Sequence, residues 1–305
     1  MIVYLKTQRM KINLAYTLIL AVLAVSCAKE KVPSPDLTVS TAGLTFKAGD
    51  TVTFKLSGNP DNITFYSGEP GRNYDFRNRT VAANDLQIQF KSYVSFGLIY
   101  QNLQVLVSSD FNGIADATNV NAATWTDISN LATFSTGADN VNSGIISLKP
   151  YKGKTDTSLL YVAFRYTDYK KTQGQNRWVI RTFSADNISP EGAVVNLATM
   201  ATGGWKAVDF KNPAAVWTIT TAQLLMQGGG ATADDNEDWV ISKGFNMSKI
   251  QPDAGIALKN ISKTLDSYRY VYNTPGTYKA IFETSAVRYN GEKRQTQEIN
   301  ITITP

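Results

Sequence analysis

The sequence of 305 residues contains no histidine and a single cysteine. Without histidine, the chain has no Ser-His or Cys-His nucleophilic centre, no histidine general base and no His-ligated zinc. One cysteine excludes an internal disulfide, a Cys-x-x-Cys redox pair and a thiolate zinc site. The chemistry that remains is carboxylate catalysis, calcium binding by oxygen ligands, or no catalysis at all.

The first 26 residues have the composition of an export signal. They carry Lys6, Arg9 and Lys11, no acidic residue, and then an apolar run from Leu14 to Val25. A membrane-spanning helix needs about 20 apolar residues. The shorter run therefore predicts a signal peptide, and either Met1 or Met10 fits as its start.

The apolar run ends in Ala24-Val25-Ser26, directly before Cys27. These small residues resemble the lipobox of bacterial lipoproteins, which implies that Cys27 becomes the first mature residue and carries a diacylglycerol on its thiol. A plain secretory signal with an incidental cysteine is the alternative. Removal of residues 1–26, which carry three positive charges, lowers the net charge from +5 to +2. The remaining chain has no clustered basic stripe, so we expect no nucleic-acid binding.

Period-2 alternation of apolar and polar residues dominates the mature chain. The clearest examples are residues 51–56, 86–91, 103–107 and 299–304. Residues 159–164 are nearly all apolar and predict a central strand covered on both faces. Only residues 220–227 suggest a short helix. The sequence therefore predicts an all-β fold of the sandwich or jelly-roll kind.

Two distant segments look like halves of one domain. After a proline-bearing tether (27–36), residues 37–78 supply opening strands and residues 254–305 supply a closing hairpin. Neither segment alone has enough strands to close a core. Together they resemble a polycystic-kidney-disease-type (PKD-like) immunoglobulin sandwich. In its Pro275-Gly276-Thr277-Tyr278 corner, Tyr278 is expected to pack inward while its hydroxyl reaches the backbone.

Residues 79–253 are long enough for an inserted second domain. Their succession of strands resembles the choice-of-anchor or cleaved-adhesin jelly roll, a galactose-binding-like fold, although Trp239-Val240-Ile241-Ser242-Lys243 comes last here rather than first. The lipobox, residues 59–71 (NPDNITFYSGEPG) and residues 238–243 (DWVISK) together resemble exported lipoproteins of the domain of unknown function 5017 family. That resemblance implies a cell-envelope role and genomic association with glycan-uptake lipoproteins, which is not a mechanism.

An acidic cluster follows a glycine-rich stretch at residues 228–233. It consists of Asp234, Asp235, Glu237 and Asp238. Calcium takes six to eight oxygen ligands, and such a loop offers both carboxylates and carbonyls. The sequence predicts a solvated, mobile loop here, with a calcium site formed by these four residues as the alternative.

Tryptophans and nearby polar residues suggest two ligand-binding surfaces. Trp205 and Trp217 lie in a stretch rich in Gly, Ala, Asn and Thr, where they either stack on sugar rings or anchor the stretch to the core. The neighbouring amides of Asn212 and Gln223 would then bond sugar hydroxyls. The second candidate surface flanks a hairpin tip at residues 170–176 and consists of Tyr166, Tyr169, Arg177 and Trp178.

These features predict a non-catalytic, surface-exposed outer-membrane lipoprotein. Its partners are expected to be the membrane, through the lipid, and a glycan or other extracellular ligand bound by the jelly roll, or an outer-membrane protein complex. A structural or adhesive envelope protein without a sugar site is the alternative. A carboxylate-dependent glycoside hydrolase is the least favoured class, because no motif places two carboxylates across a cleft.

Overall fold

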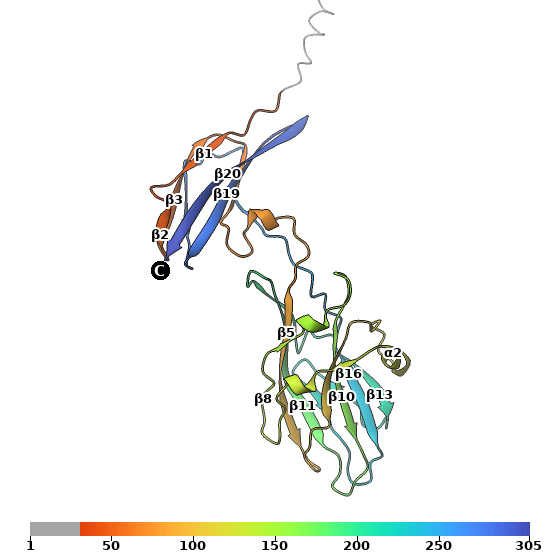
Figure 1. The fold of residues 1–305 in the computed structure, drawn as a ribbon. Helices are drawn as coiled ribbons and strands as arrows, with labels where there is room; N and C mark the ends of the chain where they lie inside the picture. The colour runs from red at the N-terminus through yellow and green to blue at the C-terminus, as the bar shows by residue number, and fades with distance from the viewer. Residues whose placement is uncertain (1–30) are drawn as a thin grey trace, which may run out of the picture. The chain divides into compact units, whose positions relative to one another are not determined.

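A computed structural model describes residues 31–305 of the chain. The predicted signal peptide, the two candidate start residues and Cys27 lie outside the described residues. The chain forms two compact units (Figure 1). The terminal unit contains the described residues up to Arg77 together with Ala254–Pro305, and the inserted unit is Asn78–Asp253.

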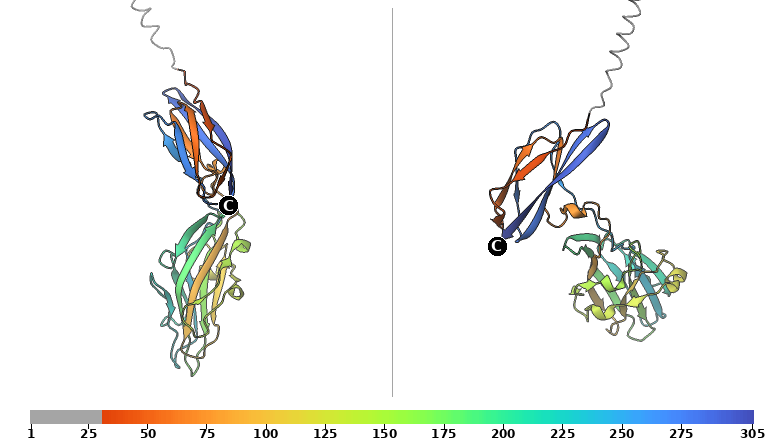
Figure 2. Two further views of the ribbon diagram at one scale, coloured as in Figure 1. Left: turned by 90° about the vertical axis from the view of Figure 1, so that its left-hand side faces the viewer. Right: turned by 45° about the horizontal axis from the view of Figure 1, so that its top comes forward.

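The terminal unit is a sandwich of two β-sheets. One sheet has the order β1-β3-β18, and the other has the order β17-β4-β19-β20-β2. All pairings are antiparallel except that of β2 with β20, and Figure 2 shows β1 and β3 across from the β19–β20 hairpin. The elements are β1 (Leu37–Ser40), β2 (Thr45–Lys47), β3 (Thr51–Gly58), β4 (Asn62–Tyr66), the 3-10 turn η1 (Tyr74–Phe76), β17 (Ile256–Lys259), β18 (Ser267–Val271), β19 (Gly276–Arg288) and β20 (Gly291–Thr304).

The core of the terminal unit combines residues from both ends of the chain. Phe54 of β3 and Phe65 of β4 pack against Phe282 of β19, with ring centroids 5.1 and 4.8 Å from the Phe282 ring. Period-2 alternation turns Ile301 and Ile303 of β20 into the same core. The two segments therefore share one hydrophobic core, and neither closes it alone.

The predicted tyrosine corner is present. Tyr278 is buried, its hydroxyl donates to the backbone oxygen of Thr274 at 2.8 Å, and its ring stacks on Tyr272 at 4.6 Å. The hydrogen bond ties the turn at Thr274 to the first residues of β19.

The inserted unit is a second two-sheet β-structure. One sheet has the order β13-β16-β10-β6-β7; the other has the order β14-β15-β11-β5-β8, with β12 on β11 and β9 on β5. The elements are β5 (Asp85–Ser95), β6 (Leu103–Ser108), α2 (Ala117–Ala122), β7 (Thr126–Asp127), η2 (Ser129–Leu131), β8 (Val141–Asn142), β9 (Ile146–Ser147), η3 (Lys149–Tyr151), β10 (Tyr161–Asp168), β11 (Arg177–Ile188), β12 (Val194–Thr199), β13 (Lys206–Lys211), β14 (Thr218–Ile219), β15 (Leu224–Met226) and β16 (Asn236–Ile241). Both units are thus all-β, as the alternation predicted.

Strand β10 lies at the centre of its sheet and is covered on both faces, which explains its apolar sequence. Val162 and Phe164 face the core between the two sheets. Tyr161 and Ala163 face a smaller cluster that contains Val120 of α2. The prediction of a central strand at residues 159–164 is confirmed.

The helix predicted at residues 220–227 is wrong. Leu224–Met226 form strand β15, which pairs with β14 and β11. Leu224 and Met226 are buried in the core between the sheets. Leu224 and Met226 are two residues apart, so both face the core when the segment is a strand. Pairing with neighbouring strands therefore favours strand over helix here. Among residues 31–305, no helix is long and apolar enough to cross a membrane.

We expect Tyr278→Phe to lower the free energy of unfolding of the terminal unit by about 1 kcal/mol, because the Thr274 carbonyl loses its hydrogen bond. The matched control is Tyr289→Phe, since Tyr289 is 79% exposed. Calorimetry or near-ultraviolet circular dichroism measures the change. Equal stability of the two variants would contradict a structural role for the tyrosine corner.

Candidate functional site

Three connections of the inserted unit cross between its two sheets at the same end. They join β5 to β6 (residues 96–102), β10 to β11 (residues 169–176) and β15 to β16 (residues 227–235). We call these three connections the loop end; it lies at the bottom of the inserted unit in Figure 1. Loops carried on a rigid sandwich are common places for binding residues.

Backbone contacts hold the three connections together. The amide of Gln175 donates to the oxygen of Gly229 at 2.7 Å, and the amide of Lys170 donates to the Asp235 carboxylate at 2.9 Å. Gly97 has a φ of +57°, and a Cβ on it would stand 2.7 Å from the oxygen of Gly174. Glycine is therefore required where the first connection meets the second.

The buried carboxylate of Asp168, at the end of β10, is the main polar contact of the loop end. It accepts hydrogen bonds from the Tyr100 hydroxyl at 2.7 Å and the Lys171 ammonium at 2.5 Å. The backbone amides of Tyr169 and Asn176 donate to it at 2.8 and 3.0 Å. One carboxylate thus joins the β5–β6 connection to both sides of the β10–β11 hairpin.

The electrostatics of this cluster favour a charged carboxylate. Burial opposes ionisation, but the hydrogen bonds from Lys171 and Tyr100 outweigh it and lower the pKa of Asp168. Burial likewise opposes the charge on Lys171, yet its bond to Asp168 raises the pKa of the ammonium. The pair is therefore ionised at neutral pH.

A depression of about 480 Å³ lies among the same connections. The groups around it are one aromatic ring, a hydroxyl, side-chain amides and glycine backbone. Its lining residues are Phe96, Gly97, Thr172, Gln173, Gly174, Gln175, Gln227, Gly228, Gly229, Gly230 and Ala231. These groups combine an apolar face with hydrogen-bond donors and acceptors, which is the make-up of small-molecule binding sites.

Large apolar side chains are exposed at the loop end. Phe96 is 62% exposed and has a φ of +62°, a costly conformation for a bulky residue. Leu98, Ile99, Tyr100 and Tyr169 are also exposed. Strained backbone and exposed apolar groups both concentrate at functional sites.

Trp205 and Trp217, predicted as sugar-stacking residues, are buried in the core between the sheets. The indole of Trp205 donates to the oxygen of Met200 at 3.1 Å, and that of Trp217 to the oxygen of Asp238 at 3.3 Å. Neither presents a ring face to a ligand, so this prediction is wrong. The alternative, in which they anchor their segment to the sandwich, is correct.

The predicted polar partners of these tryptophans serve local structure. Asn212 has a φ of +65°, and its backbone oxygen accepts the amide of Ala215 in a turn. The side-chain oxygen of Gln223 accepts a hydrogen bond from Arg181 at 2.8 Å. Since both tryptophans are buried, the sugar site predicted around them is not formed.

The second predicted surface divides into two kinds of residue. Tyr166 and Trp178 are fully buried, and their polar atoms bond the oxygen of Asn176 and the side chain of Asn102. Their prediction as ligand contacts is therefore wrong. Tyr169 is 59% exposed, and the guanidinium of the half-buried Arg177 lies 6.0 Å from the Phe96 ring centroid. These two residues flank the hairpin at the loop end, and their role as ligand contacts stays a prediction.

The four acidic residues of the candidate calcium site do not converge. Asp234 is exposed and pairs with Lys170, whereas Glu237 pairs with Arg165 at 2.8 Å. Asp238 follows Glu237 in strand β16, so its side chain faces the opposite side of the sheet and is fully buried. The described residues hold no group of three or more acidic, cysteine or histidine side chains able to bind a metal. The four-residue calcium site is therefore wrong.

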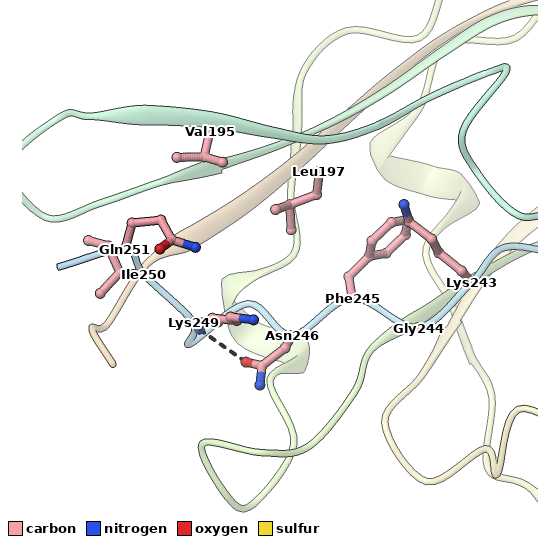
Figure 3. Close-up of a pocket in the computed structure, with 9 residues that line it drawn as sticks. All are labelled: Val195, Leu197, Lys243, Gly244, Phe245, Asn246, Lys249, Ile250 and Gln251. Carbon is pink, nitrogen blue, oxygen red and sulfur yellow. Dashed lines mark hydrogen bonds between the residues drawn. The ribbon is translucent and has the colours of Figure 1, made fainter. Parts of the chain in front are cut away.

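A second depression, of about 280 Å³, lies elsewhere in the inserted unit (Figure 3). Val195 and Leu197 of β12 line one side, and the segment from Lys243 to Gln251 lines the other. No residue predicted as a ligand contact lines it. This depression is therefore a suitable control position for tests of ligand binding at the loop end.

Phe96, Gln173 and Gln227 were missed by the sequence analysis. The signal available for Phe96 was the apolar run Phe96-Gly97-Leu98-Ile99-Tyr100 between two alternating strands. An apolar run broken by glycine and placed outside a strand is unusual for a solvent-exposed loop. For the two glutamines no local pattern marks the site, because only the fold brings them together.

The fold and loop end define an all-β protein of two sandwich units, one inserted into the other. Residues 26–205 match the family model described as "Domain of unknown function (DUF5017)", and the chain belongs to this family. No curated protein matches the chain. A solved structure of the zebrafish (Danio rerio) Fcho1 Mu homology domain with a bound Eps15 peptide aligns over 88% of both chains at 10% identity. Its TM-score of 0.10 means that the two folds do not superpose, so this alignment carries no argument.

We expect Asp168→Asn to lower the free energy of unfolding of the inserted unit by about 2 kcal/mol, because a charged acceptor of several hydrogen bonds is lost. Asp234→Asn is the matched control, since Asp234 is 86% exposed and its ion pair contributes little. Urea denaturation followed by tryptophan fluorescence reports on this unit, because all five tryptophans lie within it. If both variants unfold at the same urea concentration, the hydrogen bonds to Asp168 do not stabilise the inserted unit.

Asp238 predicts a pH dependence of stability. Burial, aided by the nearby Asp209 carboxylate, raises its pKa from 3.8 to about 8. Between these values the folded chain binds a proton that the unfolded chain has lost, so stability falls as the pH rises, by at most about 1.4 kcal/mol per pH unit. Asp238→Asn removes this slope. The free energy of unfolding of variant and wild type is measured at pH 5 and at pH 8. The same change between the two pH values in both proteins would contradict the role of Asp238.

Proposed function

We propose that this protein is a non-catalytic envelope lipoprotein that binds a glycan at the loop end of its inserted unit. The observation that carries the proposal is the depression lined by Phe96, Thr172 and glutamine side chains. An aromatic ring covers the C–H face of a sugar, and amides, hydroxyls and glycine carbonyls bond its hydroxyl groups. The volume of about 480 Å³ falls within the usual range for small-molecule sites.

Pre-organisation supports binding at this end. The Asp168 cluster and the Gln175–Gly229 hydrogen bond fix the loops before any ligand arrives. A fixed site loses less conformational entropy on binding than a mobile loop does. The lining offers groups that bond and stack, which suits recognition rather than acid–base chemistry.

Anchorage and location rest on the sequence. The small residues before Cys27 are those of a lipobox, and we propose that Cys27 carries the lipid and places the protein at the outer membrane, exposed to the outside. We also propose that the terminal unit is PKD-like, which the Tyr278 corner supports. We also propose that the inserted unit is galactose-binding-like, which its two-sheet architecture supports.

A protein partner is the second candidate, and Leu98 and Ile99 favour it. Their aliphatic side chains are 59% and 44% exposed at the loop end. Aliphatic groups contribute little to sugar stacking but are usual in protein interfaces. In this version the loop end binds an outer-membrane protein, and the chain is an adhesive or structural component.

A panel of polysaccharides titrated by calorimetry into the mature Cys27→Ser chain tests the proposal. We expect Phe96→Ala to weaken binding of the recognised glycan at least about tenfold, or about 1.4 kcal/mol. Alanine at position 96 keeps the strained φ, so the variant isolates the loss of the ring. Leu98→Ser should leave glycan binding unchanged and weaken a protein partner instead.

The control is Val195→Ala, which alters the second depression (Figure 3). It should leave glycan affinity at the wild-type value. Loss of affinity in Val195→Ala with none in Phe96→Ala would move the site away from the loop end. If no polysaccharide binds the wild-type chain, the glycan proposal is refuted.

A further inference from the structure

The turn end of the β19–β20 hairpin projects beyond the rest of its sheet. Strand β4 pairs with β19 only from Ile281 to Ser285, and β2 pairs with β20 only from Thr302 to Thr304. The residues of β20 from Gly291 to Glu298 are exposed. Past Ser285 the hairpin continues as two strands, which we call the arm, and ends at Tyr289 and Asn290. At the base of this arm the Asp61 carboxylate accepts hydrogen bonds from the backbone amide of Val287 at 2.9 Å and from the guanidinium of Arg288 at 2.6 Å.

The first described residues of the chain run along this arm. The hydroxyl of Thr284 donates to the backbone oxygen of Pro35 at 2.7 Å, and the side-chain amide of Gln295 donates to the hydroxyl of Ser34 at 3.0 Å. A Cβ on Gly291 would stand 3.7 Å from Cγ2 of Val32. The contacts move toward the turn as the residue number falls from 35 to 32.

Chain length then limits how far the arm can lie from a lipid on Cys27. Val32 is the fifth residue after Cys27, and five Cα–Cα steps of extended chain span at most about 18 Å. Since Val32 lies beside Gly291, the turn end of the arm is held within about that distance of the anchored thiol. This step rests on the lipid anchor of the proposed function.

The side chains at the turn end suit a membrane interface. Tyr289 is 79% exposed and Val287 is 48% exposed. A tyrosine places its ring among acyl chains and its hydroxyl among headgroups. Lys293 and Lys31 are exposed nearby, and lysines close to a bilayer are attracted to anionic headgroups.

We propose that the turn end of the β19–β20 hairpin, residues 287–293, is a membrane-contact surface that binds the anionic phospholipid headgroups around the anchor. Tyr289 enters the interface, and Lys293 pairs with headgroup phosphates. The diacylglycerol supplies the attachment. The arm supplies a second contact, which fixes the orientation of the terminal unit against the bilayer.

The sole cysteine makes a direct test possible. The full lipidated chain is prepared as wild type, Tyr289→Cys and Leu44→Cys, and each is reconstituted in vesicles of phosphatidylethanolamine and phosphatidylglycerol. An environment-sensitive thiol dye is attached, and lipid-borne quenchers report contact with the bilayer. Leu44 is the matched control because it is exposed and lies beside Thr302, about 36 Å along β20 from Gly291.

We expect the dye at position 289 to shift its emission to the blue and to lose most of it to the quenchers. The dye at position 44 should emit as it does in water. Identical emission and quenching at the two positions would overturn the membrane contact while leaving the anchor intact. The wild-type chain separates the two failures: if it takes up one dye per molecule, Cys27 is a free thiol, and the lipid anchor and this inference both fail.

Discussion

The geometry of the loop end depends on one buried carboxylate. Asp168 lies at the end of a central strand and accepts hydrogen bonds from Tyr100, Lys171 and two backbone amides. A buried charge is costly unless it is fully paired, so the surrounding loops are held in the one arrangement that supplies these donors. Phe96 and Tyr169 are displayed next to this cluster. Their exposed rings are therefore carried on backbone that is already fixed.

The insertion separates two tasks between two folds. The terminal unit closes only when strands from both ends of the chain pair, as Phe65 does with Phe282. Its hairpin also forms hydrogen bonds to Ser34 and Pro35, near the start of the described chain. The inserted unit has its own core and both of its sheets within residues 78–253. We therefore propose that the terminal unit serves membrane attachment and the inserted unit serves ligand binding.

The sequence predicted the architecture better than the site. Alternation in residues 51–56 and 299–304 marks strands whose apolar faces meet in one core, and the Tyr278 corner follows from local turn chemistry. The burial of Trp205 and Trp217 could not be read locally, because the residues that cover them come from distant strands. The calcium prediction treated residues 234–238 as one loop. In fact β16 begins at Asn236, so Glu237 and Asp238 point to opposite faces. Phe96 was missed because only tertiary structure shows that its loop lacks a covering element.

The central claim is that ligand binds at the loop end of the inserted unit. Backbone amide NMR of the isotope-labelled mature chain, titrated with a glycan that binds it, tests this claim most directly. The account predicts that shift changes concentrate in residues 96–100, 169–177 and 227–235. Changes confined to Val195, Leu197 and residues 243–251 would contradict it.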